Sequence, residues 1–203
     1  MNDNYTIEQF CSINEHSISL NGKTIYKDNL AKTLQEFLKS AYKTLDINYP
    51  KFFKMDTLSK LAFLTADVIL NSQVNSETDI ALVFSNNASS LDTDRKHQKS
   101  ISDEDSFYPS PSTFVYTLPN ICLGEISIKH QLYSENSFFI FDAFNADHLL
   151  AYTTALLHTN KAEKVLCGWV NVDDTNNEAI LFLIGKNGDI PFTTDQLNHL
   201  YNS

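Results

Sequence analysis

The amino-acid sequence predicts an α/β protein in which one mixed, five-stranded sheet carries helices on both faces. Short apolar runs of strand length alternate with longer segments whose apolar residues recur at helical spacing. In addition, the run DIALVF at 79–84 is almost continuously apolar, which is typical of a strand covered on both faces. The expected strands are formed by the N-terminal residues, 79–84, 137–141, 164–172 and 178–185.

The first half of the chain begins with strands and continues with two helices. The stretches YTIEQFCSI and HSISL are β-like and precede the turn signal Asn21-Gly22. Apolar spacing predicts a helix over 29–45. A second, mostly buried helix is expected to begin at Asp56, whose carboxylate would cap it. The polar segment 85–111 is expected to be a loop.

The second half alternates strands and helices more regularly. Pro119-Asn120 is a typical helix entry, and Gly124 inside that helix is expected to mark a close approach to another backbone. Residues 136–172 then form a strand, a tight turn, a helix and a second strand, and a short turn leads to the last strand. This order predicts a mostly parallel sheet with an antiparallel edge, within a single domain of residues 1–203.

Composition and charge argue against several functions. Among 203 residues, 25 are acidic and 15 are basic, which gives a formal net charge of -10, and Arg95 is the one arginine. Binding a phosphate backbone needs clustered Lys and Arg, so we expect no nucleic-acid partner. No apolar run is long enough to span a membrane, and the N-terminus lacks a signal-peptide pattern, so a cytoplasmic location is expected.

The sequence contains no motif for a cofactor or a metal ion. It has no GxGxxG, GxxxxGK or GxSxG pattern, and its histidines show neither HxxxH nor HExxH spacing, so neither kind of group is expected. Cys11, Cys122 and Cys167 lie in apolar segments and form no CxxC pair. We expect them to be free thiols buried in the core.

The turn after the strand at 137–141 is where many acyl-transfer enzymes carry a nucleophile, because a helix N-terminus stabilises a thiolate or an oxyanion. Here the turn consists of Asp142, Ala143, Phe144 and Asn145, which have neither a thiol nor a hydroxyl group. Asp142 could act as a nucleophile, but a helix cap or a surface residue is the favoured interpretation.

Five stretches within about residues 5–185 carry a family resemblance. They are YPKFFKMDTLSKLAFLTAD, DIALVFSNNASSLDTD, PSTFVYTLPNICLGEISI, the segment 135–172 and NEAILFLIG. In this order they resemble the N-terminal half of the β-ketoacyl synthases of the thiolase-like superfamily, and the pattern at Pro119, Asn120 and Gly124 matches best. The resemblance implies a half-thiolase-like three-layer fold.

The same resemblance implies an inactive site. The family's nucleophilic Cys would fall on Phe144, or on Ala143 if the turn is one residue shorter, and neither can attack a thioester. The family's two catalytic histidines and its lysine lie in a second half of the fold, which would begin beyond Ser203. We therefore expect a pseudoenzyme in which Cys167 is a core residue.

Three functions remain open. The favoured one is a non-catalytic accessory or chain-length-factor-like subunit in bacterial fatty acid, polyketide or aryl-polyene-type pigment biosynthesis. The second is a stand-alone module that binds an acyl chain or acyl carrier protein. The third is an unrecognised acyltransferase or hydrolase that uses Asp142 or Cys167.

The strand before the turn is expected to form a dimer interface. In the family that the chain resembles, this strand lies at the sheet edge and pairs antiparallel with its copy. The corresponding residues are Ser137, Phe138, Phe139, Ile140 and Phe141. So apolar an edge, with no charge to blunt it, would aggregate if left bare. We expect a homodimer or a heterodimer with a full ketosynthase, with acyl carrier protein as a further candidate partner.

We predict that Phe139→Lys weakens this dimer by a few kcal/mol, because it places a charge in the paired strand. Light scattering at micromolar concentration measures the effect. A monomeric wild type and an unchanged variant would show that this mode of pairing is absent.

Overall fold

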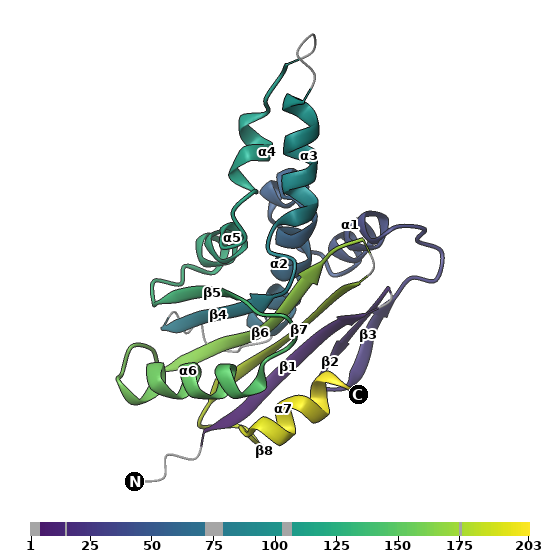
Figure 1. Ribbon diagram of the computed structural model, residues 1–203. Coiled ribbons are helices and arrows are strands. Elements are labelled where there is room, and N and C mark those ends of the chain that lie inside the picture. The colour runs from purple at the N-terminus through teal and green to yellow at the C-terminus, as the bar shows by residue number, and fades with distance from the viewer. Residues whose placement is uncertain (1–4, 15, 72–78, 103–106, 175) are drawn as a thin grey trace.

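The computed structural model describes residues 5–14, 16–71, 79–102, 107–174 and 176–203. In these residues, one eight-stranded sheet has the order β3-β2-β1-β7-β6-β4-β5, with β8 paired to β1 (Figure 1). The strands are β1 Thr6–Asn14, β2 Ser17–Leu20, β3 Lys23–Lys27, β4 Ile80–Asn86, β5 Asn136–Ile140, β6 Lys164–Val172, β7 Asn177–Gly185 and β8 Ile190–Pro191. The predicted α/β class with one mixed sheet is confirmed.

The expectation of five strands in a mostly parallel sheet is wrong. Within the described ranges, β4 pairs parallel with β5 and β6, and the other pairs are antiparallel. The N-terminal residues form three strands, and β1 pairs with β7, as in the register Ile7 with Ile184. Partners so far apart in sequence leave no local pattern, so the pairing could not be read from neighbouring residues.

The central strands are buried on both faces of the sheet. Along β7, Leu181 and Leu183 belong to one core, and Phe182 and Ile184 belong to the other. This alternation is the two-residue period of a strand. Helices α1, α2 and α5 cover the first face, and α6 and α7 cover the second, which gives three layers (Figure 1).

The helices are α1 Leu34–Thr44, α2 Thr57–Leu70, α3 Leu91–Ile101, α4 Pro111–Val115, α5 Ile121–His130, α6 Ala146–His158 and α7 Thr194–Tyr201, with a 3₁₀ helix, η1, at Pro50–Lys54. The predicted cap at Asp56 is confirmed, because its Oδ1 accepts a hydrogen bond from Ser59 N at 2.9 Å. Helix α1 starts later than expected, after Thr33, whose hydroxyl accepts from Glu36 N. In the described parts of the chain, no helix is long and apolar enough to cross a bilayer.

The expected loop at 85–111 instead contains α3 and the start of α4, while residues 103–106 lie outside the described part. Helix α3 has a single buried residue, Thr93, so it lacks the apolar face that predicts a helix. Polar contacts hold it in place. Lys96 and Asp92 pair across one turn at 2.6 Å, and Arg95 reaches Asp174 at 2.6 Å.

A close backbone approach occurs at Gly168 and not at Gly124, so the expectation for Gly124 is wrong. An added Cβ on Gly124 would meet no atom within 4 Å, apart from neighbours in its own helix. Gly168 lies on β6 with φ +156°, and a Cβ there would lie 2.1 Å from the carbonyl oxygen of Ile180 on β7. This close approach lies within the antiparallel pair β6–β7 at the centre of the sheet.

We predict opposite effects for two glycine replacements. Gly168→Ala should lower the free energy of unfolding by more than about 2 kcal/mol through overpacking and backbone strain. Gly124→Ala, its matched control, should raise it by about 0.5–1 kcal/mol, because alanine is the better helix former. Urea unfolding followed by circular dichroism measures both. Equal losses in the two variants would contradict this account.

Candidate functional site

The candidate site is the turn between β5 and α6. Strands β5, β4 and β6 run parallel, so their carboxyl ends meet at one side of the sheet. In open α/β sheets, ligands bind outside the carboxyl ends of such strands. The turn at 142–145 follows β5 at this position, which is where chemistry would be expected.

Two of the four turn residues are exposed to solvent, and one caps the next helix. Asp142 and Ala143 are exposed. Asn145 is the cap of α6, and its Oδ1 accepts a hydrogen bond from His148 N at 2.9 Å. The interpretation of Asp142 as a cap or surface residue is met by its surface alternative. A neutral amide satisfies the helix end in its place.

Phe144 is the turn residue that packs inward. Its ring stacks on Tyr201 of α7, with centroids 4.3 Å apart, and meets the edge of Trp169 on β6 at 6.3 Å. The hydroxyl of Tyr201 and the indole N–H of Trp169 both donate to Glu178 Oε1, at 2.8 and 3.1 Å. Burial, together with the bond to Glu178, raises the pKa of Tyr201. The apolar ring of Phe144 thus packs the turn against β6 and α7.

The contact between the turn and α7 was missed at the sequence level. A signal for α7 was present, because Thr193 and Gln196 have the spacing of a capping box. In the structure, Gln196 N donates to the hydroxyl of Thr193 at 3.2 Å. The pattern gives the helix start. It gives no indication that Tyr201 would stack on Phe144.

The three thiols are free and buried, as predicted. Cys167 lies on β6 with no exposed area, and burial raises its pKa to about 12. Burial also raises the pKa values of Cys11 and Cys122. A thiolate is the reactive form, so burial and a raised pKa both disfavour a nucleophilic role for these side chains. In the described residues, no group of three His, Cys, Asp or Glu could hold a metal ion.

Strand β5 lies at one end of the sheet order, so the predicted edge position is confirmed. The ring of Phe138 contacts the core on the α2 face. Phe139 lies on the α6 face, with its ring 4.4 Å from His148 and 5.0 Å from Tyr152. Ile140 is 55% exposed. The pairing of this strand with another chain stays a prediction.

Comparison with solved structures supports the fold. The ishigamide ketosynthase/chain length factor matches with a TM-score of 0.64 and 14% identity over 91% of this chain and 62% of that one. The ketosynthase ApeO in complex with its chain length factor ApeC, from Xenorhabdus doucetiae, matches with a TM-score of 0.63 and 15% identity. This match covers 98% of this chain and 90% of that one. A type II PKS acyl-carrier protein in complex with its ketosynthase matches with a TM-score of 0.63 and 11% identity. This match covers 91% of this chain and 63% of that one.

The chain has the α/β fold of the N-terminal half of thiolase-like ketosynthases. It spans about six tenths of two of these matched chains and nine tenths of the third. At such low identity the likeness concerns the fold. No protein-family model matches the sequence, and a search of curated proteins found no match.

We predict that the native protein forms no covalent adduct with an acyl thioester, because its thiols are buried and protonated. Intact-mass spectrometry after incubation with acetyl-CoA measures this. As a control, iodoacetamide should label Cys11, Cys122 and Cys167 once guanidinium has unfolded the chain. An acyl adduct on any of the three in the native state would contradict the prediction.

Proposed function

We propose that this chain is a catalytically silent, chain-length-factor-like subunit that pairs with a complete ketosynthase. The observation that carries the proposal is the turn after β5. In the family resemblance, the nucleophilic Cys falls on Phe144 or Ala143. Phe144 instead fills its position by stacking on Tyr201. A side chain without a lone pair, packed against an aromatic ring, has no route to a covalent intermediate.

The size of one matched chain supports an accessory role. The match to the ApeO–ApeC complex covers 98% of this chain and 90% of that one, so a chain of about this length occurs in a ketosynthase–chain length factor assembly. By analogy, the pathway would be a bacterial fatty acid, polyketide or aryl-polyene-type synthesis. Acyl carrier protein would then be a further partner, as the third match illustrates.

The two outer edges of the sheet differ in charge, so one edge is better suited than the other to pair with a partner chain. Edge strand β3 has the sequence KTIYK, and its two lysines oppose pairing with another chain. Edge strand β5 has the sequence NSFFI and carries no charge. The backbone N–H of Phe141 donates to Asn86 O on β4. Backbone groups alternate in direction along a strand, so the N–H and C=O groups of Phe138 and Ile140 face away from the sheet.

Further exposed apolar side chains gather on neighbouring elements. Helices α4 and α5 and strand β5 lie along one side of the molecule (Figure 1). In and near these elements, the large exposed apolar residues are Phe107, Tyr108, Phe114, Val115, Leu118, Ile128, Tyr133 and Ile140. Such a concentration is typical of a protein–protein interface. Together with β5, it favours a partner that covers this whole side.

A matched pair of edge substitutions tests the pairing. Ile140 on β5 and Ile25 on β3 are 55% and 40% exposed, so a lysine at either position should leave the fold intact. We predict that Ile140→Lys weakens association with the partner at least tenfold, about 1.4 kcal/mol, while Ile25→Lys has no effect. Analytical ultracentrifugation measures both. These variants are cleaner than Phe139→Lys, since Phe139 also packs on α6.

Co-expression with a complete ketosynthase from the same organism tests the function itself. We expect the two chains to co-purify at equal stoichiometry, and condensation to need the partner's Cys. Loss of condensing activity when this subunit is removed would support an accessory role. A stable homodimer that leaves the ketosynthase alone would overturn the heterodimer, and a monomer would overturn both forms of pairing.

A further inference from the structure

A pocket with several lysines lies where α2 begins, apart from the turn after β5. Its volume is about 190 Å³. The lysines that line it are Lys54 from η1, Lys60 from α2 and Lys96 from α3, and the hydroxyls of Ser112 and Thr113 come from α4. The whole chain has a formal net charge of -10, so a cluster of lysines contrasts with its acidic composition.

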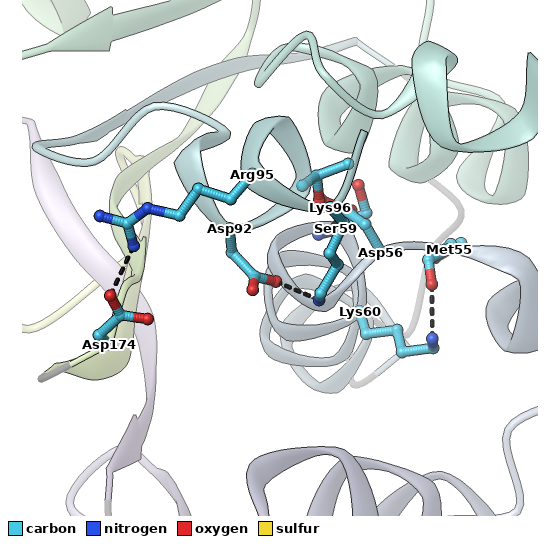
Figure 2. Close-up of polar contacts among 9 residues, drawn as sticks. Met55, Asp56, Ser59, Lys60, Asp92, Arg95, Lys96 and Asp174 are labelled. Carbon is cyan, nitrogen blue, oxygen red and sulfur yellow. Dashed lines mark hydrogen bonds and ion pairs between the residues drawn. The ribbon is translucent and has the colours of Figure 1, made fainter. Parts of the chain in front are cut away.

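Lys60 is the unusual member of this group. Its side chain is 7% exposed, and its ammonium group donates to the carbonyl oxygen of Met55 at 2.5 Å (Figure 2). Among the described residues, no carboxylate forms an ion pair with it. Buried charges are normally paired, and here the Asp56 carboxylate attracts the ammonium group without forming an ion pair with it. Burial lowers the pKa of Lys60, and the nearby Lys39 and Lys96 lower it further, whereas Asp56 raises it.

Asp56 is close to this charge but is committed elsewhere. Its Oδ1 accepts from Ser59 N at 2.9 Å, and its Oδ2 accepts from the Thr93 hydroxyl at 2.8 Å. Lys96 in turn pairs with Asp92 (Figure 2). Three lysines and one carboxylate, Asp56, line the pocket, and the Glu125 carboxylate accepts a hydrogen bond from Tyr116 in its wall.

We propose that this pocket binds a phosphate group, held by the ammonium groups of Lys54, Lys60 and Lys96. A phosphate monoester carries about -1.5 to -2 charges at neutral pH, so the three ammonium groups would attract it. Its oxygens accept several hydrogen bonds, which suits ammonium and hydroxyl donors from three or more elements. The inference is independent of the function proposed above.

The size of the pocket limits the ligand. Pockets for drug-sized molecules measure about 300–1,000 Å³, so about 190 Å³ suits one phosphate group with at most a small attached moiety. The phosphate could be inorganic or could belong to a small organic ester. Both share the chemistry of the site, and titration with each distinguishes them.

Thermal unfolding and calorimetric titration test the proposal. Inorganic phosphate or glycerol 3-phosphate, at a hundredfold excess over its dissociation constant, should raise the Tm of the full chain by about 5–10 °C over chloride at equal ionic strength. The phosphate species that binds more tightly identifies the source. Lys60→Met should abolish this shift, and Lys96→Met, at an exposed position, should weaken binding at least tenfold. Lys161→Met, at an exposed lysine in the turn after α6, is the matched control and should bind as the wild type does.

Two outcomes would overturn the proposal. One is a Tm that rises no more in phosphate or glycerol phosphate than in chloride. The other is a phosphate response that persists in both Lys60→Met and Lys96→Met. If Lys60→Met fails to fold, Lys96→Met decides alone, because its side chain is half exposed and its loss leaves the core intact.

Discussion

The burial of α2 is the constraint on which the other elements depend. All but one of its residues, Val68, are buried, between the sheet and helices α1 and α5. Such a helix has no solvent-facing side, so its polar groups need partners inside the protein. Thr65 donates to Leu61 O at 2.8 Å, and Asp67 lies 2.9 Å from His130 of α5, at ion-pair distance although not aligned as a hydrogen bond.

The same helix contacts both the sheet and the polar helix α3, which is followed by α4. Its cap, Asp56, accepts from Thr93, the buried residue of α3, and Lys60 reaches back to the end of η1. A change in the position of α2 would therefore move the lysine pocket and the exposed apolar side chains of α4 together. The turn after β5 lies on the other face of the sheet, against α7, so the two regions can change independently.

The sequence was informative where a local pattern determines the structure. The apolar runs at 79–84, 164–172 and 178–185 predicted the central strands. The prediction that α2 begins at Asp56 was correct. In each case the physical cause is contained within a few neighbouring residues.

Sequence reasoning failed where the cause is remote. The pairing of β1 with β7 and the stacking of Phe144 on Tyr201 join segments that share no local signal. Helix α3 was missed because it has no apolar stripe and contacts the rest of the protein through polar residues such as Thr93 and Arg95. The Gly124 expectation failed because a helix glycine does not reveal what lies opposite it. Lys60 was overlooked for a similar reason, since its burial results from the arrangement of η1, α3 and α4 around it.

The difference between the two sheet edges limits how this protein can assemble. When an edge strand pairs with a second chain, the sheet can grow further only if that second chain has another unpaired edge. Because β3 carries two lysines and β5 carries no charge, the proposed pairing would use β5 and leave β3 unpaired. Two such chains, or one chain and a partner with a similar single edge, can close on each other and then stop. Linear growth into a fibre would need a second receptive edge, and β3 does not offer one.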